Sequence, residues 1–80
     1  MTRLTIYSRP GCHLCDEMKA VVHRVSASIP LSLDEVDISG DAELERLYGL
    51  EIPVLMLDGK KVAKYRIGES ELVRMVTRRA

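Results

Sequence analysis

The sequence contains no tryptophan, no phenylalanine and only two cysteines, and its charges cancel. Twelve basic side chains are matched by twelve acidic ones. The protein therefore has no overall field with which to hold a nucleic acid or an anionic membrane by counterion release. Arg74, Arg78 and Arg79 gather near the C-terminus, where cations complement the negative end of a helix dipole. We expect neither a nucleic acid nor a membrane as a partner.

No apolar stretch is long enough for a signal peptide or a membrane-spanning helix, because Met1-Thr2-Arg3 leads directly into a short alternating segment. We therefore expect the protein in the cytoplasm. Two cysteines in that compartment are more often catalytic or metal-binding than structural, since its thiols are kept reduced. A disulfide that closes so small a loop would also remove little chain entropy from the unfolded state.

No linker divides the 80 residues, a length that suits one compact domain. Hydrophobic residues make up 46% of the chain and charged residues 30%, a mixture typical of globular rather than disordered proteins. We expect a single domain over residues 1–80 and a monomer.

The first half of the chain alternates between strand and helix patterns. Residues 4–7 predict a first strand, and the turn residues 8–11 end it. A helix that Pro30 stops is then indicated by apolar residues at helical spacing: Leu14, Met18, Val21, Val22, Val25 and Ile29. A second strand is expected within 31–38, where the apolar positions change phase between Leu33 and Val36 and allow a bulge.

The second half begins with a short helix and continues with a hairpin. Ser39-Gly40-Asp41 can cap a helix with Leu44, Leu47 and Tyr48 on one face, and Gly49 ends it. The apolar run 54–57 suits a central strand, and Asp58-Gly59 favours a type I′ turn into an antiparallel strand over about 61–65.

A last helix follows Gly68, with Glu69 or Ser70 as its cap. Its predicted inward-facing residues are Leu72, Val73, Met75 and Val76. The order is thus strand, helix, strand, helix, strand, strand, helix, which is the minimal form of the thioredoxin fold. We expect an α/β protein with a four-stranded mixed sheet, three helices on its two faces, and a ligand site at the loop after the first strand.

Cys12 and Cys15 carry the chemistry that this order suggests. Thiolate, not thiol, attacks a disulfide, and unpaired backbone N–H groups at a helix N-terminus stabilise negative sulfur. Cys12 falls at or next to the cap of the first helix, and Cys15 lies in its first turn, so the two sulfurs can approach bonding distance. We expect Cys12 to be the nucleophile and Cys15 to resolve the mixed disulfide.

Charged residues surround this pair. Arg9, three residues before Cys12, and His13, directly after it, would favour the thiolate, whereas the acidic residues of the next turn would oppose it. His13 either makes the pair more oxidising or is a solvated surface residue, and the sequence supports both interpretations equally.

The Cys-x-x-Cys spacing also serves half of many zinc sites, but this chain has no second such pair. The remaining nitrogen ligands are His13 and His23, which an ideal helix separates by about 15 Å along its axis. We expect no metal site of this kind.

The run Ile6-Tyr7-Ser8-Arg9-Pro10-Gly11-Cys12-His13-Leu14-Cys15 resembles the active-site segment of glutaredoxins, and the similarity, closest to small bacterial glutaredoxin-like proteins, extends over nearly the whole chain. The resemblance implies that Arg9 contacts glutathione and that Pro10 and His13 border the substrate.

Glu51-Ile52-Pro53-Val54 is similar to the family's Val-Pro segment. The resemblance implies a cis Pro53 that faces the cysteines and an Ile52 backbone that pairs with extended substrate. From the residues alone, a trans proline that opens a strand is the common case, since about 5–6% of X-Pro bonds are cis. Gly68-Glu69 stands where glutaredoxins usually have a Gly-Gly pair and an acid that holds the glutamyl end of glutathione.

The resemblance implies a dithiol oxidoreductase that reduces protein disulfides or glutathione mixed disulfides, with no tightly bound cofactor and with glutathione as a candidate co-substrate. Its electron donor would be glutathione or a flavoprotein of the thioredoxin reductase kind. Two alternatives belong to other classes: an iron–sulfur or other metal carrier that uses Cys12 and glutathione, and a binding module whose cysteines only pack.

Overall fold

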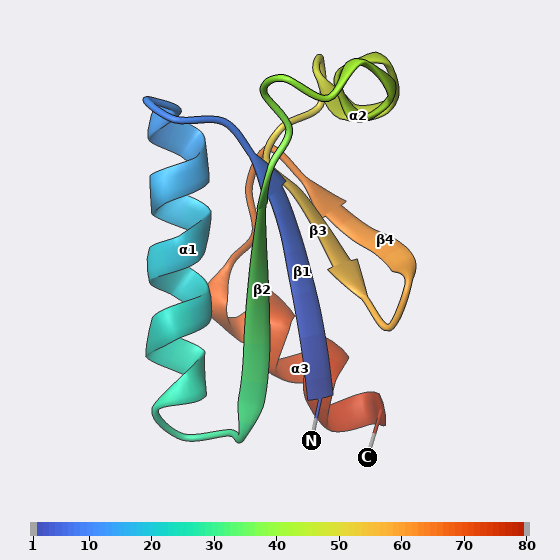
Figure 1. Ribbon diagram of the computed structural model, residues 1–80. Coiled ribbons are helices and arrows are strands. Elements are labelled where there is room, and N and C mark those ends of the chain that lie inside the picture. Colours follow the sequence, from blue (N-terminus) through green and yellow to red (C-terminus); the bar gives the residue numbers. More distant parts are fainter. Residues whose placement is uncertain (1, 80) are drawn as a thin grey trace.

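The computed structural model describes residues 2–79 (Figure 1). Its elements follow the predicted order: β1 (Thr2–Ser8), α1 (His13–Ser26), β2 (Leu31–Asp37), α2 (Ala42–Tyr48), β3 (Val54–Leu57), β4 (Lys60–Lys64) and α3 (Glu69–Arg79). The α/β class and the minimal thioredoxin-type order expected from the sequence are confirmed.

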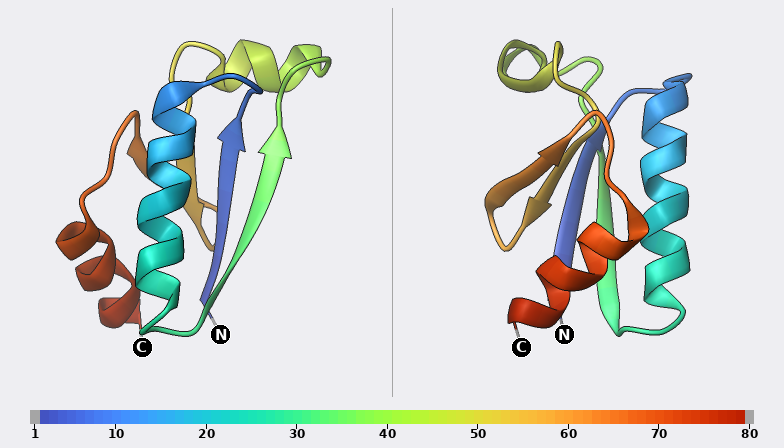
Figure 2. Two further views of the ribbon diagram at one scale, coloured as in Figure 1. Left: turned by 90° about the vertical axis from the view of Figure 1, so that its left-hand side faces the viewer. Right: turned by 180° about the vertical axis from the view of Figure 1, so that it is seen from behind.

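The four strands form one mixed sheet in the order β2-β1-β3-β4. β1 and β2 are parallel and are joined by α1, whereas β1 with β3 and β3 with β4 are antiparallel. In Figure 2, α1 and α3 lie together on one face of the sheet, and α2 lies beyond the ends of β1 and β2, toward the other face.

The core forms where α1 and α3 cover the sheet. Alternate residues of β1 point to opposite faces, so Leu4 and Ile6 are fully buried beneath the two helices while Thr5 and Tyr7 on the other face are half-buried. The same buried cluster also takes residues from α1, β3, α3 and the segment before α3: Met18, Val22, Val25, Leu55, Leu57, Ile67, Leu72 and Val76. Each fully buried aliphatic side chain contributes about 1.5–3 kcal/mol, so this cluster fixes α1 on the sheet.

The β3–β4 hairpin confirms the turn expected at Asp58-Gly59. Both residues have positive φ, 49° and 88°, as a type I′ turn requires, and glycine adopts such an angle at no steric cost. β4 begins at Lys60 and ends at Lys64, so Tyr65, expected in the strand, lies just past it with a φ of 69°.

The bulge allowed in the second strand is absent there. The β1–β2 register runs without interruption from Thr2 opposite Leu31 to Ser8 opposite Asp37. β2 is an edge strand whose apolar side chains on both faces are only half-buried, so its pattern need not keep one phase. The irregularity lies instead between β3 and β4, at Leu55/Met56.

Three details of the helices differ from the expectations. α1 ends at Ser26, and Ile29 follows in a turn where its N–H donates to the Val25 carbonyl at 3.0 Å. Leu47 of α2 is 46% exposed, and no residue of this short helix is buried. Val73 is 36% exposed, since α3 buries only the narrower stripe that contains Leu72 and Val76.

α3 also begins one residue earlier than expected. Glu69 is its first helical residue, and the Leu72 N–H donates to the Gly68 carbonyl at 3.0 Å. The cap position is thus Gly68 rather than Glu69 or Ser70, because the first intrahelical bond is accepted by the residue before the helix.

Candidate active site

The loop after β1 delivers Cys12 to the start of α1. Gly11 has a φ of 78°, a left-handed angle that glycine adopts readily, and the Cys12 N–H then donates to the Arg9 carbonyl at 3.3 Å. Cys12 has extended backbone angles, and its carbonyl accepts from the Asp16 N–H at 3.2 Å. Cys12 is therefore the N-cap of α1, as the sequence predicted.

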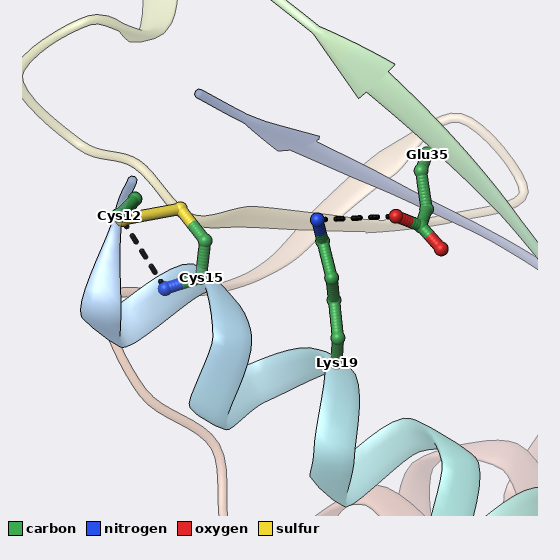
Figure 3. The surroundings of a disulfide bond; sticks show 4 residues. All are labelled: Cys12, Cys15, Lys19 and Glu35. Atoms are coloured by element: carbon green, nitrogen blue, oxygen red, sulfur yellow. Dashed lines mark hydrogen bonds and ion pairs between the residues drawn. A yellow bond between two sulfur atoms is a disulfide. The ribbon is translucent and has the colours of Figure 1, made fainter. Parts of the chain in front are cut away.

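Cys12 and Cys15 are joined by a disulfide, with their Cα atoms 5.2 Å apart (Figure 3). The backbone N–H of Cys15 donates to the sulfur of Cys12 at 3.2 Å. The two sulfurs differ in access, since the Cys12 side chain is partly exposed and Cys15 is 1% exposed. Cys12 is thus open to solvent, whereas Cys15 is enclosed.

An open, charged cleft of about 300 Å³ lies beside this loop, at the carboxyl ends of β1 and β2. Residues 8–11 line it together with Asp16 and Lys19 of α1 and Glu35 and Asp37 of β2. Figure 3 shows Lys19 one turn after Cys15, with its ammonium group directed toward Glu35 and 3.1 Å from the carboxylate. The sheet edge at which the sequence placed a ligand site is therefore hollowed.

Arg9, Pro10 and His13 lie where the sequence placed them, next to Cys12, but the two basic side chains have partners. The Arg9 guanidinium forms an ion pair with Glu45 of α2. His13 is 88% exposed, and its Nε2 lies 2.8 Å from Glu17. Pro10 is an exposed residue of the turn.

The Ile52–Pro53 peptide bond is cis, as the resemblance implied. Val54 pairs with Tyr7, so Pro53 lies beside the end of β1 from which the cysteine loop departs. Pro53 is buried, and its carbonyl accepts from the Tyr65 N–H at 2.9 Å. Within residues 2–79 the N–H and C=O groups of Ile52 have no hydrogen-bond partner, as a backbone that receives an extended chain requires.

The Glu69 carboxylate is directed to the other end of α1 from the cysteines. Glu69 accepts a hydrogen bond of 2.6 Å from Arg24, near the last turn of α1. Arg24 follows Cys12 by 12 residues, which is about 18 Å along a helix axis. Among the expected binding residues, the Glu69 carboxylate is therefore remote from the dithiol.

Two carboxyl groups near this end of the sheet have altered acidity. The Ser39 hydroxyl and N–H donate to Asp37 at 2.6 and 2.9 Å and hold the pKa of that carboxyl below its usual value. Lys61 donates to Glu51 at 2.6 Å and likewise lowers the pKa of Glu51, just before Ile52. Both carboxylates are therefore held in the charged form.

The described residues include no group of three or more His, Cys, Asp or Glu side chains arranged to hold a metal ion. Over the same residues, no helix combines the length and the apolar character that crossing a membrane would take.

Glu45 and Tyr65 are two contributors to this region that the sequence did not indicate, in addition to Lys19, Glu35 and Asp37 of the cleft. Glu45 pairs with Arg9 across 36 residues of sequence, and the Tyr65 hydroxyl donates to the Leu50 carbonyl at 3.0 Å. No local sequence pattern predicts either contact, because both depend on how α2 and β4 pack at the end of β1.

Comparisons with known proteins agree with this geometry. A family model described as glutaredoxin-like domain (DUF836) matches residues 3–77. A glutaredoxin-like protein of Dictyostelium discoideum, the YDR286C homolog, is 32% identical over an alignment of 77 residues; the match covers 86% of this chain and 69% of that protein.

Solved structures extend the comparison. The X-ray structure of target protein XcR50 from X. campestris has a TM-score of 0.79 and 32% identity, over 94% of this chain and 96% of that one. Protein Ne2328 from Nitrosomonas europaea has a TM-score of 0.80 and 30% identity, over 92% and 89% of the two chains. A thioredoxin from Halobacterium salinarum, at 22% identity and a TM-score of 0.64 over 96% and 73%, shares the fold.

Proposed function

Because the chain belongs to the glutaredoxin-like (DUF836) family, we propose that it is a thiol–disulfide oxidoreductase that reduces protein disulfides or glutathione mixed disulfides through Cys12 and Cys15. The observation that carries this proposal is the hydrogen bond from the Cys15 N–H to the sulfur of Cys12, at 3.2 Å, at the cap of α1. In the reduced protein the same N–H and the positive end of the helix favour the Cys12 thiolate.

The first step is attack on the substrate. The Cys12 thiolate attacks one sulfur of the substrate disulfide, a bond forms between them, and the other substrate sulfur leaves as a thiolate that takes up a proton. The partial exposure of Cys12 and the cleft beside its loop support this role.

The second step releases the product. Cys15 loses its proton and attacks the sulfur of Cys12, which forms the intramolecular disulfide and frees the remaining substrate thiolate. Two electrons have then passed from the dithiol to the substrate. The burial of Cys15 supports this division of roles, because a buried thiol reacts only with a sulfur brought to it.

The unpaired backbone of Ile52 supplies a place for polypeptide substrates. An extended segment beside the scissile disulfide can donate to the Ile52 carbonyl and accept from its N–H, as an added strand does. Backbone pairing of this kind suits substrates of varied sequence.

Return to the dithiol needs two electrons from an external thiol or reductase. Glutathione as co-substrate, or a flavoprotein of the thioredoxin reductase kind, would supply them by the reverse exchange. The protein itself would hold no cofactor, since the reacting groups are its two sulfurs.

Variants of each cysteine test the proposal. Turnover of a protein disulfide is measured with glutathione and glutathione reductase, and separately with a thioredoxin reductase system. Cys12→Ser should abolish reduction with either donor, whereas Cys15→Ser should form a mixed disulfide with the substrate, detected by intact mass. If the unmodified protein reduces no disulfide with either donor, the proposal is wrong.

A further inference from the structure

The guanidinium of Arg9, on the loop that leads to the reactive cysteine, is already paired with a carboxylate. Arg9 stands three residues before Cys12, and the Arg9 carbonyl accepts the Cys12 N–H. Its guanidinium forms an ion pair with Glu45, and the two side chains are 41% and 42% exposed. A carboxylate on an incoming substrate would therefore compete with Glu45 for Arg9.

Glu45 is presented to Arg9 by the packing of α2. Arg9 directly follows β1 and stands two residues after Tyr7, so the two side chains lie on one side of the chain. Glu45 and Tyr48 are three residues apart and share a face of α2. The rings of Tyr7 and Tyr48 stack with their centroids 4.5 Å apart. The ion pair and the ring stack thus form one interface between α2 and β1.

Because Gly49 has no side chain, the Arg9 guanidinium can lie close to the end of α2. A Cβ atom at this position would lie 3.5 Å from the Arg9 Nη2 and only 2.5 Å from the Glu45 carbonyl oxygen. Arg9 therefore lies along the last turn of α2, next to the backbone that carries Glu45.

Two other basic side chains near the cysteine end also have carboxylate neighbours in the described chain. Lys19 lies 3.1 Å from Glu35, and His13 lies 2.8 Å from Glu17. A substrate carboxylate that bound Arg9 or Lys19 would thus compete with a carboxylate of the protein.

We propose that Glu45 is a specificity-determining residue, which occupies Arg9 and so disfavours disulfides that carry carboxylates beside their sulfurs, such as glutathione disulfide, relative to neutral ones. This inference rests on the proposed reduction of disulfides by Cys12. Exposed Arg–carboxylate pairs have modest free energies, which correspond to about a twofold to fivefold change in a rate or affinity.

Single-turnover oxidation of the reduced protein measures this preference without an external donor. Glutathione disulfide and the neutral bis(2-hydroxyethyl) disulfide are each mixed with excess reduced protein, and the loss of alkylatable thiols gives two rate constants. Glu45→Gln should raise the ratio of the glutathione disulfide rate to the neutral rate by about twofold to fivefold at low salt, and high salt should reduce the gain.

Glu43→Gln is the matched control. Glu43 lies on the same helix and loses an ion pair of 2.6 Å, with Arg46, that does not involve the cysteine loop. This variant should leave both rate constants unchanged. Repeating Glu45→Gln in an Arg9→Gln background should remove the gain, because the effect then has no cation through which to act.

An unchanged ratio in Glu45→Gln would overturn the inference, as would an equal gain in Glu43→Gln or a gain that persists without Arg9. Circular dichroism of each variant establishes that α2 is still formed. If the unmodified reduced protein reacts with neither disulfide, the proposed function itself is refuted, and this inference with it.

Discussion

Alkylation of the reduced protein at pH 6 tests the thiolate on which the chemistry depends. Two single-cysteine variants are compared: Cys15→Ser, which leaves Cys12 as the only thiol, and Cys12→Ser, which leaves Cys15. The first thiol is partly exposed at the cap of α1, and the second is 1% exposed. We expect the Cys12 thiol to react with iodoacetamide faster than free cysteine, and the Cys15 thiol to react more slowly.

The size of the effect follows from the hydrogen bond to Cys12. Free cysteine, with a pKa of about 8.5, is about 0.3% thiolate at pH 6. A hydrogen bond to a charged acceptor contributes about 2 kcal/mol. At about 1.36 kcal/mol for each factor of ten, this hydrogen bond favours the Cys12 thiolate about thirtyfold.

Stabilised thiolates are weaker nucleophiles, so the gain in rate is smaller than the gain in population. A Brønsted slope of about 0.45 reduces the reactivity of each thiolate by about fivefold here. The net expectation is alkylation of Cys12 about six times faster than that of N-acetylcysteine at pH 6. Intact mass at timed quenches measures both rates. A Cys12 rate no greater than that of the free thiol, or an equal rate at Cys15, would refute the reasoning.

Three further predictions concern stability. Leu72→Ala should lower the free energy of unfolding by about 2–5 kcal/mol in urea titrations because its side chain is fully buried, whereas Val73→Ala should cost less than about 1 kcal/mol. The pKa of Glu51 lies below its usual value because Lys61 donates to it, so the stability it contributes is present above about pH 4.5 and lost as the pH falls through its folded pKa. Glu51→Gln should therefore flatten the loss of stability between pH 6 and 3. Asp41→Ala, which removes the N-cap of α2, should cost about 0.5–2 kcal/mol in the same titrations.

Each of these three predictions has an outcome that would contradict it. Equal losses from Leu72→Ala and Val73→Ala would mean that α3 is rotated from its described position. A wild-type and a Glu51→Gln protein with parallel pH profiles would mean that Lys61 does not hold the carboxylate in solution. An Asp41→Ala protein with an unchanged free energy of unfolding would mean that water replaces the cap hydrogen bond from the Leu44 N–H.

The sequence predicted the fold well because the decisive signals are local. Pro30 stops a helical pattern, and Asp58-Gly59 readily adopts the two positive φ angles that a type I′ turn requires, so each element follows from a few adjacent residues. Cys12 as a helix cap was predictable for the same reason, since the strand, the turn and the helix around it are contiguous.

What could not be predicted depends on contacts between distant segments. A helical stripe that contains both Leu72 and Val73 does not reveal how wide the buried part is, and only the packing against α1 leaves Val73 exposed. Likewise Glu69 meets Arg24 across 45 residues, which takes it away from the dithiol. Such pairings become visible only when the helices are placed on the sheet.

The stacked tyrosines give the protein a built-in optical probe. With no tryptophan and no phenylalanine in the chain, its near-ultraviolet signal comes from Tyr7, Tyr48 and Tyr65, apart from the disulfide. Two of these rings lie face to face, 4.5 Å apart, where α2 meets the strand that leads to the cysteines. Because near-ultraviolet dichroism reports fixed aromatic packing, undocking of α2 could be followed without attaching a label.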